Sequence, residues 1–590
     1  MLDEIKYLKK AIIPLAVFLG AGFYYYHQAC PTFYYWDSAE LTAAVLGRGV
    51  PHPPGFPFFL ILSSAWQRFL SLDPKLSLNV FSALFGALGL CFWYQVTVKV
   101  LRLLRLAKSE GIISLVSLVS VAIMGVSLTY SIQATRFEVY SLNFAGFAAL
   151  TLICLSIINR ETPSKLLSLG FFMLLGAFLA VHNLTIALAI PGLLLLVVWP
   201  QKMTLGNALL GTIGSFIFSG LFYLLLLFRA QSNPPLNWGD PANLGNLVDY
   251  ILVKGFVTST SRFTLSHIIA QLSFAYDIFI RQIGPAALAL ALFGFGYVIW
   301  KKREIGIPLT LIFGLNIVSV AFAENYFYEN YDLHGYLMIS LAIAIIFLAV
   351  TFLLIHNLIM SRFKGKRAEV TRALALGIFL IFAMLILAPP AKDNFRSADL
   401  SKVRGAEEYA GRFLADAPDS SVVITSSYNT YFCALAYQAL FPNTRGKAVV
   451  NLYNWDHEWG RDESDRALKI PAQEKFIRTS YYSDFINRAK KSHPVFIEYD
   501  QSSAPIARYL IPRGMGYLFS LSDTLSDPAT FAVDDPYISL SSKASDLESI
   551  RTWVLWLQSR GEYFTRLKCD KAASRYIAQI DTLASKADLQ

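Results

Sequence analysis

The sequence predicts a polytopic α-helical membrane protein that carries an α/β domain at its carboxyl end. Of the 590 residues, 55% are hydrophobic and only 16% are charged. Long apolar runs recur from residue 11 to about residue 389 and then stop. A soluble globular protein rarely has such a composition. We therefore expect a membrane domain at residues 1–390 and a separate extracytoplasmic domain at residues 391–590.

Apolar runs of nearly bilayer length predict about eleven membrane spans. Several runs are short, and we expect those spans to tilt or to pack inside the bundle. The expected spans are 11–26, 77–98, 112–130, 139–158, 166–181, 184–200, 207–228, 285–300, 306–323, 336–358 and 373–389.

Basic residues predict the orientation. Lysines at 6–10 and the basic stretches 99–108, 301–303 and 362–367 fall on one side of the expected membrane. Because cytoplasmic loops carry an excess of Lys and Arg, the amino terminus is expected in the cytoplasm and the carboxyl-terminal domain outside it, as in a bacterial inner-membrane protein. The formal net charge of +10 then reflects these loops and not nucleic-acid binding.

The first outer loop, residues 27–76, contains "YWDSAELTAAVLGRGVPHPPGFPFF". Asp37 or Ser38 can begin a helix, the prolines from 51 to 57 forbid one, and "FFLILSSAWQRFL" resumes it. We expect two amphipathic helices along the membrane, joined by a rigid turn. Asp37 and Glu40 have the spacing of a capping box, and His52 between prolines can brace the turn, so spacing alone leaves structural roles open.

The other outer loops gather further polar residues at the ends of the expected spans. Ionisable groups there are costly unless they are hydrated or paired, so their convergence indicates a water-accessible cavity. Arg136 and Glu138 are two residues apart, so on one helix they would point apart and each would need another partner. "NWGDP" can equally be a turn. The residues concerned are Arg136, Glu138, His182, Asn183, Trp238, Asp240, Arg262, His267 and Arg281.

"WDSAEL…GVPHPPGFPFF" resembles the signature of the domain of unknown function 2723 family, whose eukaryotic members are transmembrane protein O-mannosyltransferases of the GT-C superfamily. "FEVYSLN" at 137–143, "LAVHNLTIALAIPGL" at 179–193 and "NWGDP" at 237–241 follow in the family's order. Ala39 replaces a common glycine, and "TSSYNTYF" at 425–432 replaces an acidic stretch of the tail. The second difference argues against an acidic site in the tail.

The resemblance implies a GT-C-like fold and a glycosyltransferase that moves a sugar from a polyprenyl-phosphate carrier to an acceptor hydroxyl on the extracytoplasmic side. It places catalysis on Asp37, with Glu40 and Glu138 orienting Asp37 or the acceptor. The phosphate needs cations or N–H donors. Candidates for binding the donor are His52, Arg136, Arg262, Arg281, Arg229, His182, Asn183, Trp238 and Asp240.

The acceptor would be a protein serine or threonine, or an envelope glycan or lipid. Asp37, Glu40, Glu138 and His182 could ligate a divalent metal, but no spacing demands one, and we expect none to be required. The alternative is a transporter or flippase of lipid-linked sugars, which should carry internal repeats and charges in the middle of its spans.

The tail alternates helical and β-rich segments. "SVVITSS", "KAVVNLYNW", "HPVFIEYD" and "MGYLFSLSD" are expected strands, "GAEEYAGRFLAD" is an expected helix, and about 45 residues at the end are expected to be helical. This alternation predicts an α/β sandwich.

Overall fold

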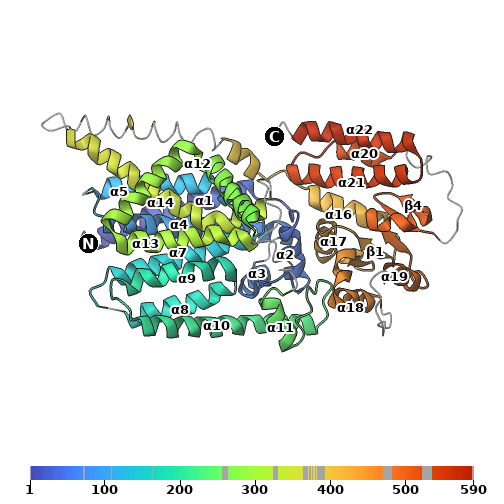
Figure 1. Cartoon of the computed structure of the whole chain (residues 1–590), viewed down its shortest axis with the longest axis horizontal. Helices are drawn as coiled ribbons and strands as arrows, with labels where there is room; N and C mark the ends of the chain where they lie inside the picture. The colour runs from blue at the N-terminus through green and yellow to red at the C-terminus, as the bar shows by residue number, and fades with distance from the viewer. Residues whose placement is uncertain are drawn as a thin grey trace.

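The chain folds into a helical bundle and an α/β domain that lie end to end, with α2 and α3 between them (Figure 1). This computed structural model describes residues 2–70, 73–107, 109–162, 164–254, 264–322, 328, 330–362, 370, 374, 377–378, 381, 392–468, 481–520 and 535–587. The expected domain boundary at residue 390 falls outside these residues.

The bundle is built from long apolar helices joined by short connections. Proline and polar caps begin several of them: the Asp73 carboxylate accepts from the Lys75 N–H at 3.0 Å, with Pro74 as the first helical residue of α4. The helices are α1 (Leu2–Gln28), α2 (Asp37–Leu46), α3 (Pro57–Phe69), α4 (Pro74–Leu103), α5 (Glu110–Val126), α6 (Leu128–Thr135), α7 (Val139–Ile158), α8 (Lys165–Leu179), α9 (Asn183–Val198), α10 (Leu205–Gln231), α11 (Leu244–Ile251), α12 (Leu265–Lys301), α13 (Arg303–Val318) and α14 (Tyr331–Arg362).

Several of these helices can cross a membrane, as the sequence predicts. Among the described residues, five helices are long and apolar enough by length and composition, namely α4, α7, α10, α12 and α14, or six if α5 and α6 form one broken span. Helices α8, α9 and α13 have 15, 16 and 16 residues, short for a span of about 20. The expected span at 373–389 lies largely outside the described residues, so the number eleven stays a prediction.

Helix α14 is the centre of the bundle, because 89% of its most apolar stretch is buried, against 22% for α10. It packs on α12, α13 and α5. The expected continuous span at 112–130 is wrong in one respect: the chain breaks at Ser127, which is extended, and α6 turns away from α5 by 64°. After this break the connection between α6 and α7 lies against the start of α14, where Arg136 pairs with Asp332.

The carboxyl-terminal domain contains one five-stranded sheet in the order β2-β1-β3-β5-β4. The first three strands are parallel, and β5 and β4 are antiparallel to their neighbours. The expected strands appear as β1 (Val422–Thr425), β2 (Ala448–Asn451), β3 (Val495–Ile497) and β5 (Gly516–Phe519), whereas β4 (Leu510–Arg513) was not expected. Its helices are α16 (Gly405–Asp416), α17 (Tyr428–Leu440), α18 (Glu458–Ala467), α19 (Tyr481–Ala489), α20 (Pro536–Ser541), α21 (Leu547–Arg566) and α22 (Asp570–Ala587).

Helix α2 joins the two domains. It packs against α17 of the carboxyl-terminal domain, and residues Ser38 to Val45 are all buried. Protein therefore covers α2 on both sides, and its expected position along the membrane surface stays a prediction. The residues at its first turn are held between the bundle and the α/β domain.

Candidate active site

The site begins at Trp36 and Asp37. Trp36 has φ 55° and ψ −128°, and α2 starts at the next residue, Asp37. Among the residues that the structure describes, no side chain caps this end of the helix. The capping-box interpretation of Asp37 and Glu40 is wrong: with the cap position at Trp36, Glu40 is the fourth helical residue, one too far along to reach back. Both carboxylates are free for other partners.

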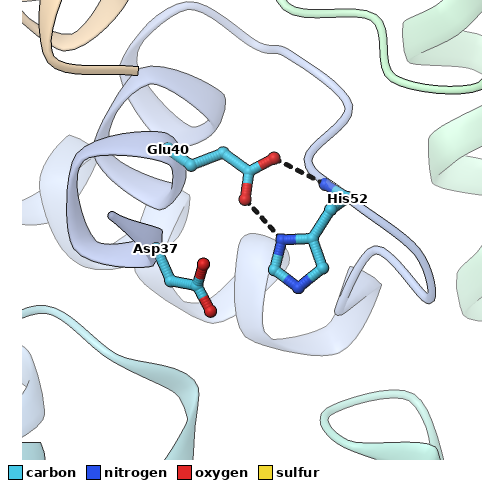
Figure 2. A group of neighbouring side chains, drawn as sticks. All are labelled: Asp37, Glu40 and His52. Carbon is cyan, nitrogen blue, oxygen red and sulfur yellow. Dashed lines mark hydrogen bonds and ion pairs between the residues drawn. The ribbon is translucent and has the colours of Figure 1, made fainter. Parts of the chain in front are cut away.

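Glu40 holds His52. One Glu40 oxygen accepts from the His52 backbone N–H at 2.7 Å, and the other bonds the ring Nδ1 (Figure 2). Glu40 is fully buried, while the His52 side chain is 25% exposed. Burial lowers the pKa of His52, but the carboxylates of Glu40 and Asp37 outweigh it and raise the pKa to about 10. His52 is therefore an imidazolium at neutral pH, with Nδ1–H donated to Glu40.

Arg136 and Glu138 lie in the connection between α6 and α7. Both are extended, with φ −131° and −145°, and in an extended chain residues i and i+2 point to the same side. The guanidinium of Arg136 is 3.7 Å from the Glu138 carboxylate, so the expectation that these residues point apart is wrong. A second carboxylate, Asp332 at the start of α14, pairs with Arg136 at 2.5 Å. Arg136 and Glu138 are each only 1% exposed.

Asp37 completes a group of three carboxylates with Glu138 and Asp332. One oxygen from each lies within 4.8 Å of the others, and Asp37 also lies within that distance of Glu40 and His52. In Figure 2 the Asp37 carboxylate is on the same side of α2 as the imidazole ring. Burial, followed by the charge of Asp332, raises the pKa of Asp37 to about 7, although His52 acts in the opposite direction. Burial likewise raises the pKa of Glu138.

The three carboxylates could hold a divalent cation. Hard cations prefer carboxylate oxygens, and neither oxygen of the buried Glu138 accepts a hydrogen bond from the part of the chain that the structure describes. Arg136 lies beside the same oxygens and already neutralises part of their charge. The expected ligand His182 is not in this group, because its Nδ1 faces the Thr185 hydroxyl at 3.0 Å.

His182 and Asn183 lie at the start of α9. The His182 ring stacks on Phe56 at 6.2 Å and contacts Tyr140 and Tyr336 at 5.1 and 5.2 Å between ring centroids. Burial, and next the charge of His52, lowers the pKa of His182 to about 3. His182 is therefore neutral and part of an aromatic wall beside His52. Asn183 is the first residue of α9 and is half-buried.

Trp238 and Asp240 lie at the contact between the two domains. The Trp238 ring packs on Tyr428 and Trp459, with centroids 5.0 and 5.7 Å away. Asp240 pairs with Arg466 of α18 at 3.4 Å. The backbone N–H of Trp238 donates to the Val50 carbonyl at 3.1 Å, and this bond connects "NWGDP" to the first outer loop. These contacts dock the carboxyl-terminal domain and do not reach the carboxylates.

The other arginines have separate partners. Arg229 donates to the carbonyls of Ala44 and Gly49, both at 3.0 Å, and so fixes the end of α2. Arg281 is 52% exposed, pairs with Asp277 at 3.2 Å and lies over the Tyr328 ring. Arg262 lies outside the described residues. Only Arg136, of the described arginines named as candidates, contacts the carboxylate group.

Three comparisons with known proteins bear on this site. Residues 37–206 match the family model "Protein O-mannosyl-transferase TMEM260 N-terminal domain", a segment that starts at Asp37 and includes His52, Arg136 and Glu138. No curated protein matches the chain. The resemblance to O-mannosyltransferases is thus confirmed for this segment, whereas the name of domain of unknown function 2723 is not.

Solved structures give the fold. ArnT from Cupriavidus metallidurans in the apo state has a TM-score of 0.53 at 11% identity, covering 87% of this chain and 98% of that one. Its complex with undecaprenyl phosphate gives the same score and identity, with 88% and 99% covered. The oligosaccharyltransferase of Archaeoglobus fulgidus scores 0.47 at 12% identity, covering 83% and 70%. The fold is GT-C-like. Together with the family model, the similarity to ArnT supports a membrane glycosyltransferase.

Some residues of the site could not be singled out from the sequence. Asp332 is the clearest example of a missed residue. The sequence does contain a signal for it, because an acid in the first turn of a strongly apolar helix is costly to bury without a partner. Trp36, Asn429 and Glu548 gave no signal, because their contact is made between distant parts of the chain.

Proposed function

We propose that the protein is an inverting glycosyltransferase that moves a sugar from a polyprenyl-phosphate carrier to an acceptor hydroxyl on the extracytoplasmic face. One observation carries the proposal: Asp37 lies beside Glu138 and Asp332 and next to the cations His52 and Arg136. This arrangement offers a base for a hydroxyl and positive charge for a phosphate, the two requirements of the reaction.

Asp37 acts as the base. As the acceptor oxygen attacks the anomeric carbon, Asp37 takes the hydroxyl proton, the new C–O bond forms on the face opposite the phosphate, and the bond between the anomeric carbon and the phosphate oxygen breaks. A single displacement inverts the anomeric centre. Because its pKa is raised to about 7, Asp37 is both sufficiently ionised and sufficiently basic near neutral pH.

The leaving group is a polyprenyl phosphate, already a stable anion, so no strong acid is needed. Its charge requires a cation or N–H donors. His52 is the better partner, because its side chain is 25% exposed and stays protonated up to about pH 10, the value to which its pKa is raised. Arg136 is buried between Glu138 and Asp332, so its main role here is to hold these carboxylates near Asp37.

The carrier and the acceptor are assigned by chemistry. ArnT, which has the same fold, has been solved bound to undecaprenyl phosphate, and this supports a polyprenyl-phosphate sugar as donor. The family model over residues 37–206 supports mannose and a protein serine or threonine as the first choices. An envelope glycan or lipid remains the other acceptor class.

No metal is needed for this mechanism. Asp37, Glu138 and Asp332 fit a divalent cation, which would supply positive charge toward the leaving phosphate. We propose instead that protons and Arg136 balance their charge, because Arg136 pairs with two of them and burial raises the pKa values of Asp37 and Glu138.

A transporter or flippase of lipid-linked sugars is the alternative. Its ionisable groups should line a path through the middle of the bundle. Here the carboxylate group lies where α2, the connection before α7 and the first turn of α14 meet, at one end of the helices (Figure 1). This placement favours an enzyme.

The test is mass spectrometry of envelope glycoproteins and glycans from cells with the wild-type protein, with Asp37→Asn or without the protein. We expect one hexose modification to be lost both in the deletion and in Asp37→Asn, at equal protein levels. Full glycosylation by Asp37→Asn would remove Asp37 as the base. An unchanged glycan profile in the deletion would contradict the glycosyltransferase itself.

A further inference from the structure

Trp36 has a backbone conformation that non-glycine residues rarely adopt. Its φ of 55° with ψ of −128° corresponds to the first central residue of a type II′ turn, a position dominated by glycine. Such a residue persists where its surroundings hold it, and strain of this kind is concentrated at functional sites. Trp36 directly precedes Asp37, so its torsion angles set the direction in which the Asp37 side chain leaves α2.

The carboxyl-terminal domain holds Trp36 at two points. The backbone N–H of Trp36 donates to the Asn429 side-chain oxygen at 3.1 Å, at the start of α17. The indole Nε1–H donates to the Glu548 carboxylate at 2.8 Å, in the first turn of α21. Glu548 is 5% exposed, so the carboxylate that accepts this bond is buried. Residues of one domain thus fix the torsion angles before Asp37 in the other.

The two preceding residues bind the same turn of α21. The Tyr34 hydroxyl lies 3.5 Å from an Asp546 oxygen, and the Tyr35 hydroxyl lies 3.0 Å from the Ser549 hydroxyl. Three consecutive aromatic residues therefore contact three residues at one helix start. Tyr34 and Tyr35 are fully buried anchors, whereas Trp36 is 38% exposed at the edge of the site.

We propose that Trp36 is a positioning residue through which the docked carboxyl-terminal domain fixes Asp37 for catalysis. This inference rests on the proposed function of Asp37. In the described part of the chain no side chain caps α2 at Trp36, and the Ser38 hydroxyl of its first turn accepts from Tyr34 N–H at a long 3.4 Å, so restraint of the Trp36 donors must come from elsewhere. The bonds to Asn429 and Glu548 supply that restraint, and the α/β domain is thereby a part of the active site.

The chain offers a docking contact that does not involve Trp36. Lys75 of α4 pairs with Glu407 of α16 at 2.5 Å. Glu407→Ala and Glu548→Ala are therefore the same substitution at two contacts between the domains, the first made to Lys75 and the second made to Trp36. A purely structural role of docking predicts similar effects of the two variants.

The experiment compares purified Trp36→Phe, Glu548→Ala, Glu548→Gln and Glu407→Ala. Initial rates of transfer from undecaprenyl phosphomannose into membranes of cells lacking the protein are measured against donor concentration and pH. We expect kcat to fall about tenfold in Trp36→Phe and Glu548→Ala, with donor KM within about twofold of wild type, because misplacement of a reacting group is costly. Glu548→Gln keeps an acceptor oxygen and should recover most of the rate.

The pH profile distinguishes positioning from simple loss of folded enzyme. Trp36→Phe changes no charge. If the low-pH limb of the pH–rate profile nevertheless moves, the Asp37 carboxylate has moved relative to the charged groups around it, which are Asp332, His52, Glu40 and Arg136. Glu407→Ala should keep the wild-type limb and kcat. The double variant Trp36→Phe, Glu548→Ala should be no slower than Glu548→Ala alone, because Glu548→Ala already removes the bond to the indole together with the pair that Glu548 makes with Arg551.

The outcomes separate this inference from the proposed function. Inactive Asp37→Asn together with wild-type kcat and pH profile in Trp36→Phe and Glu548→Ala would overturn the positioning role alone. Equal losses in Glu407→Ala and Glu548→Ala would do the same. Fully active Asp37→Asn would overturn the base and this inference with it. If Glu548→Ala does not fold, Trp36→Phe and Glu548→Gln decide the question.

Discussion

Glu40 accepts two hydrogen bonds from His52, one from its backbone N–H and one from its ring. The same carboxylate thus fixes the proline-rich turn and keeps the imidazole charged. Glu40→Gln removes the largest influence that raises the pKa of His52 from its ordinary value. We expect the high-pH limb of the pH–rate profile to move to lower pH, with donor KM rising at pH 8. A profile identical to wild type would show that the His52 charge is not used.

The pH–rate profile of the wild-type enzyme should be bell-shaped. Asp37 must be ionised, so the rate rises as pH increases through about 7, the value to which its pKa is raised. His52 must be charged, so the rate falls as pH increases through about 10, its raised pKa. Donor-saturated initial rates between pH 5 and pH 11 test both limbs.

Two substitutions should move the low-pH limb in opposite directions. Asp332 raises the pKa of Asp37 and His52 lowers it. Asp332→Asn should therefore move the limb to lower pH, and His52→Gln should move it to higher pH. Arg281→Gln serves as the control, because its side chain is exposed and pairs with Asp277. Shifts of the same sign in both variants would mean that Asp37 is not the titrating group.

Arg136→Met should strongly destabilise the protein. It leaves Glu138 and Asp332 without their buried cation, and breaking such a pair costs about 3–5 kcal/mol. Adding Glu138→Gln and Asp332→Asn should restore part of the lost melting temperature in detergent. If Arg136→Met melts like wild type, the pairing at this connection is unimportant for stability.

Arg229→Met should affect stability and not donor binding. Arg229 donates to two carbonyls at the end of α2, and we expect a loss of about 2 kcal/mol in the free energy of unfolding. Donor KM should stay within about twofold of wild type, because the Arg229 guanidinium binds carbonyls of the protein itself and not the phosphate of the donor. A large rise in donor KM with an unchanged melting temperature would instead make Arg229 a phosphate ligand.

Chelation tests how the three carboxylates are neutralised. With protons and Arg136 balancing their charge, the rate should survive an excess of EDTA. Added Mn²⁺ that binds Asp37, Glu138 and Asp332 would compete with protons and move the low-pH limb to lower pH. Loss of activity in EDTA with recovery in Mg²⁺ or Mn²⁺ would assign the group to a divalent cation.

Much of the fold could be predicted from the sequence, because it depends on hydrophobic runs and strand patterns that are local. The apolar helices and four of the five strands follow directly from them. The break at Ser127 could not be predicted, since residues 112–130 are uncharged and mainly apolar, without a proline to mark the 64° bend. The short strand β4 lacks a distinct pattern of its own.

The site could be predicted in part. Asp37, Glu40, His52, Arg136 and Glu138 were candidates, and the structure brings them together with Asp332. Their individual contacts were harder to predict. Capping-box spacing suggested that Glu40 reaches back to its own helix, but the turn at Trp36 moves the helix start and leaves Glu40 to His52. The expectation for Arg136 and Glu138 assumed a helix, but the backbone at both residues is extended.

The bond between Trp36 and Glu548 joins residues separated by 512 positions in the chain. During translation, Asp37 leaves the ribosome early, whereas Glu548 is made only after the bundle and most of the α/β domain. A nascent chain therefore carries Asp37 long before it can form the bond that restrains the residue in front of it. We therefore expect a chain that terminates before α21 to insert and yet to transfer sugar more slowly than the complete chain.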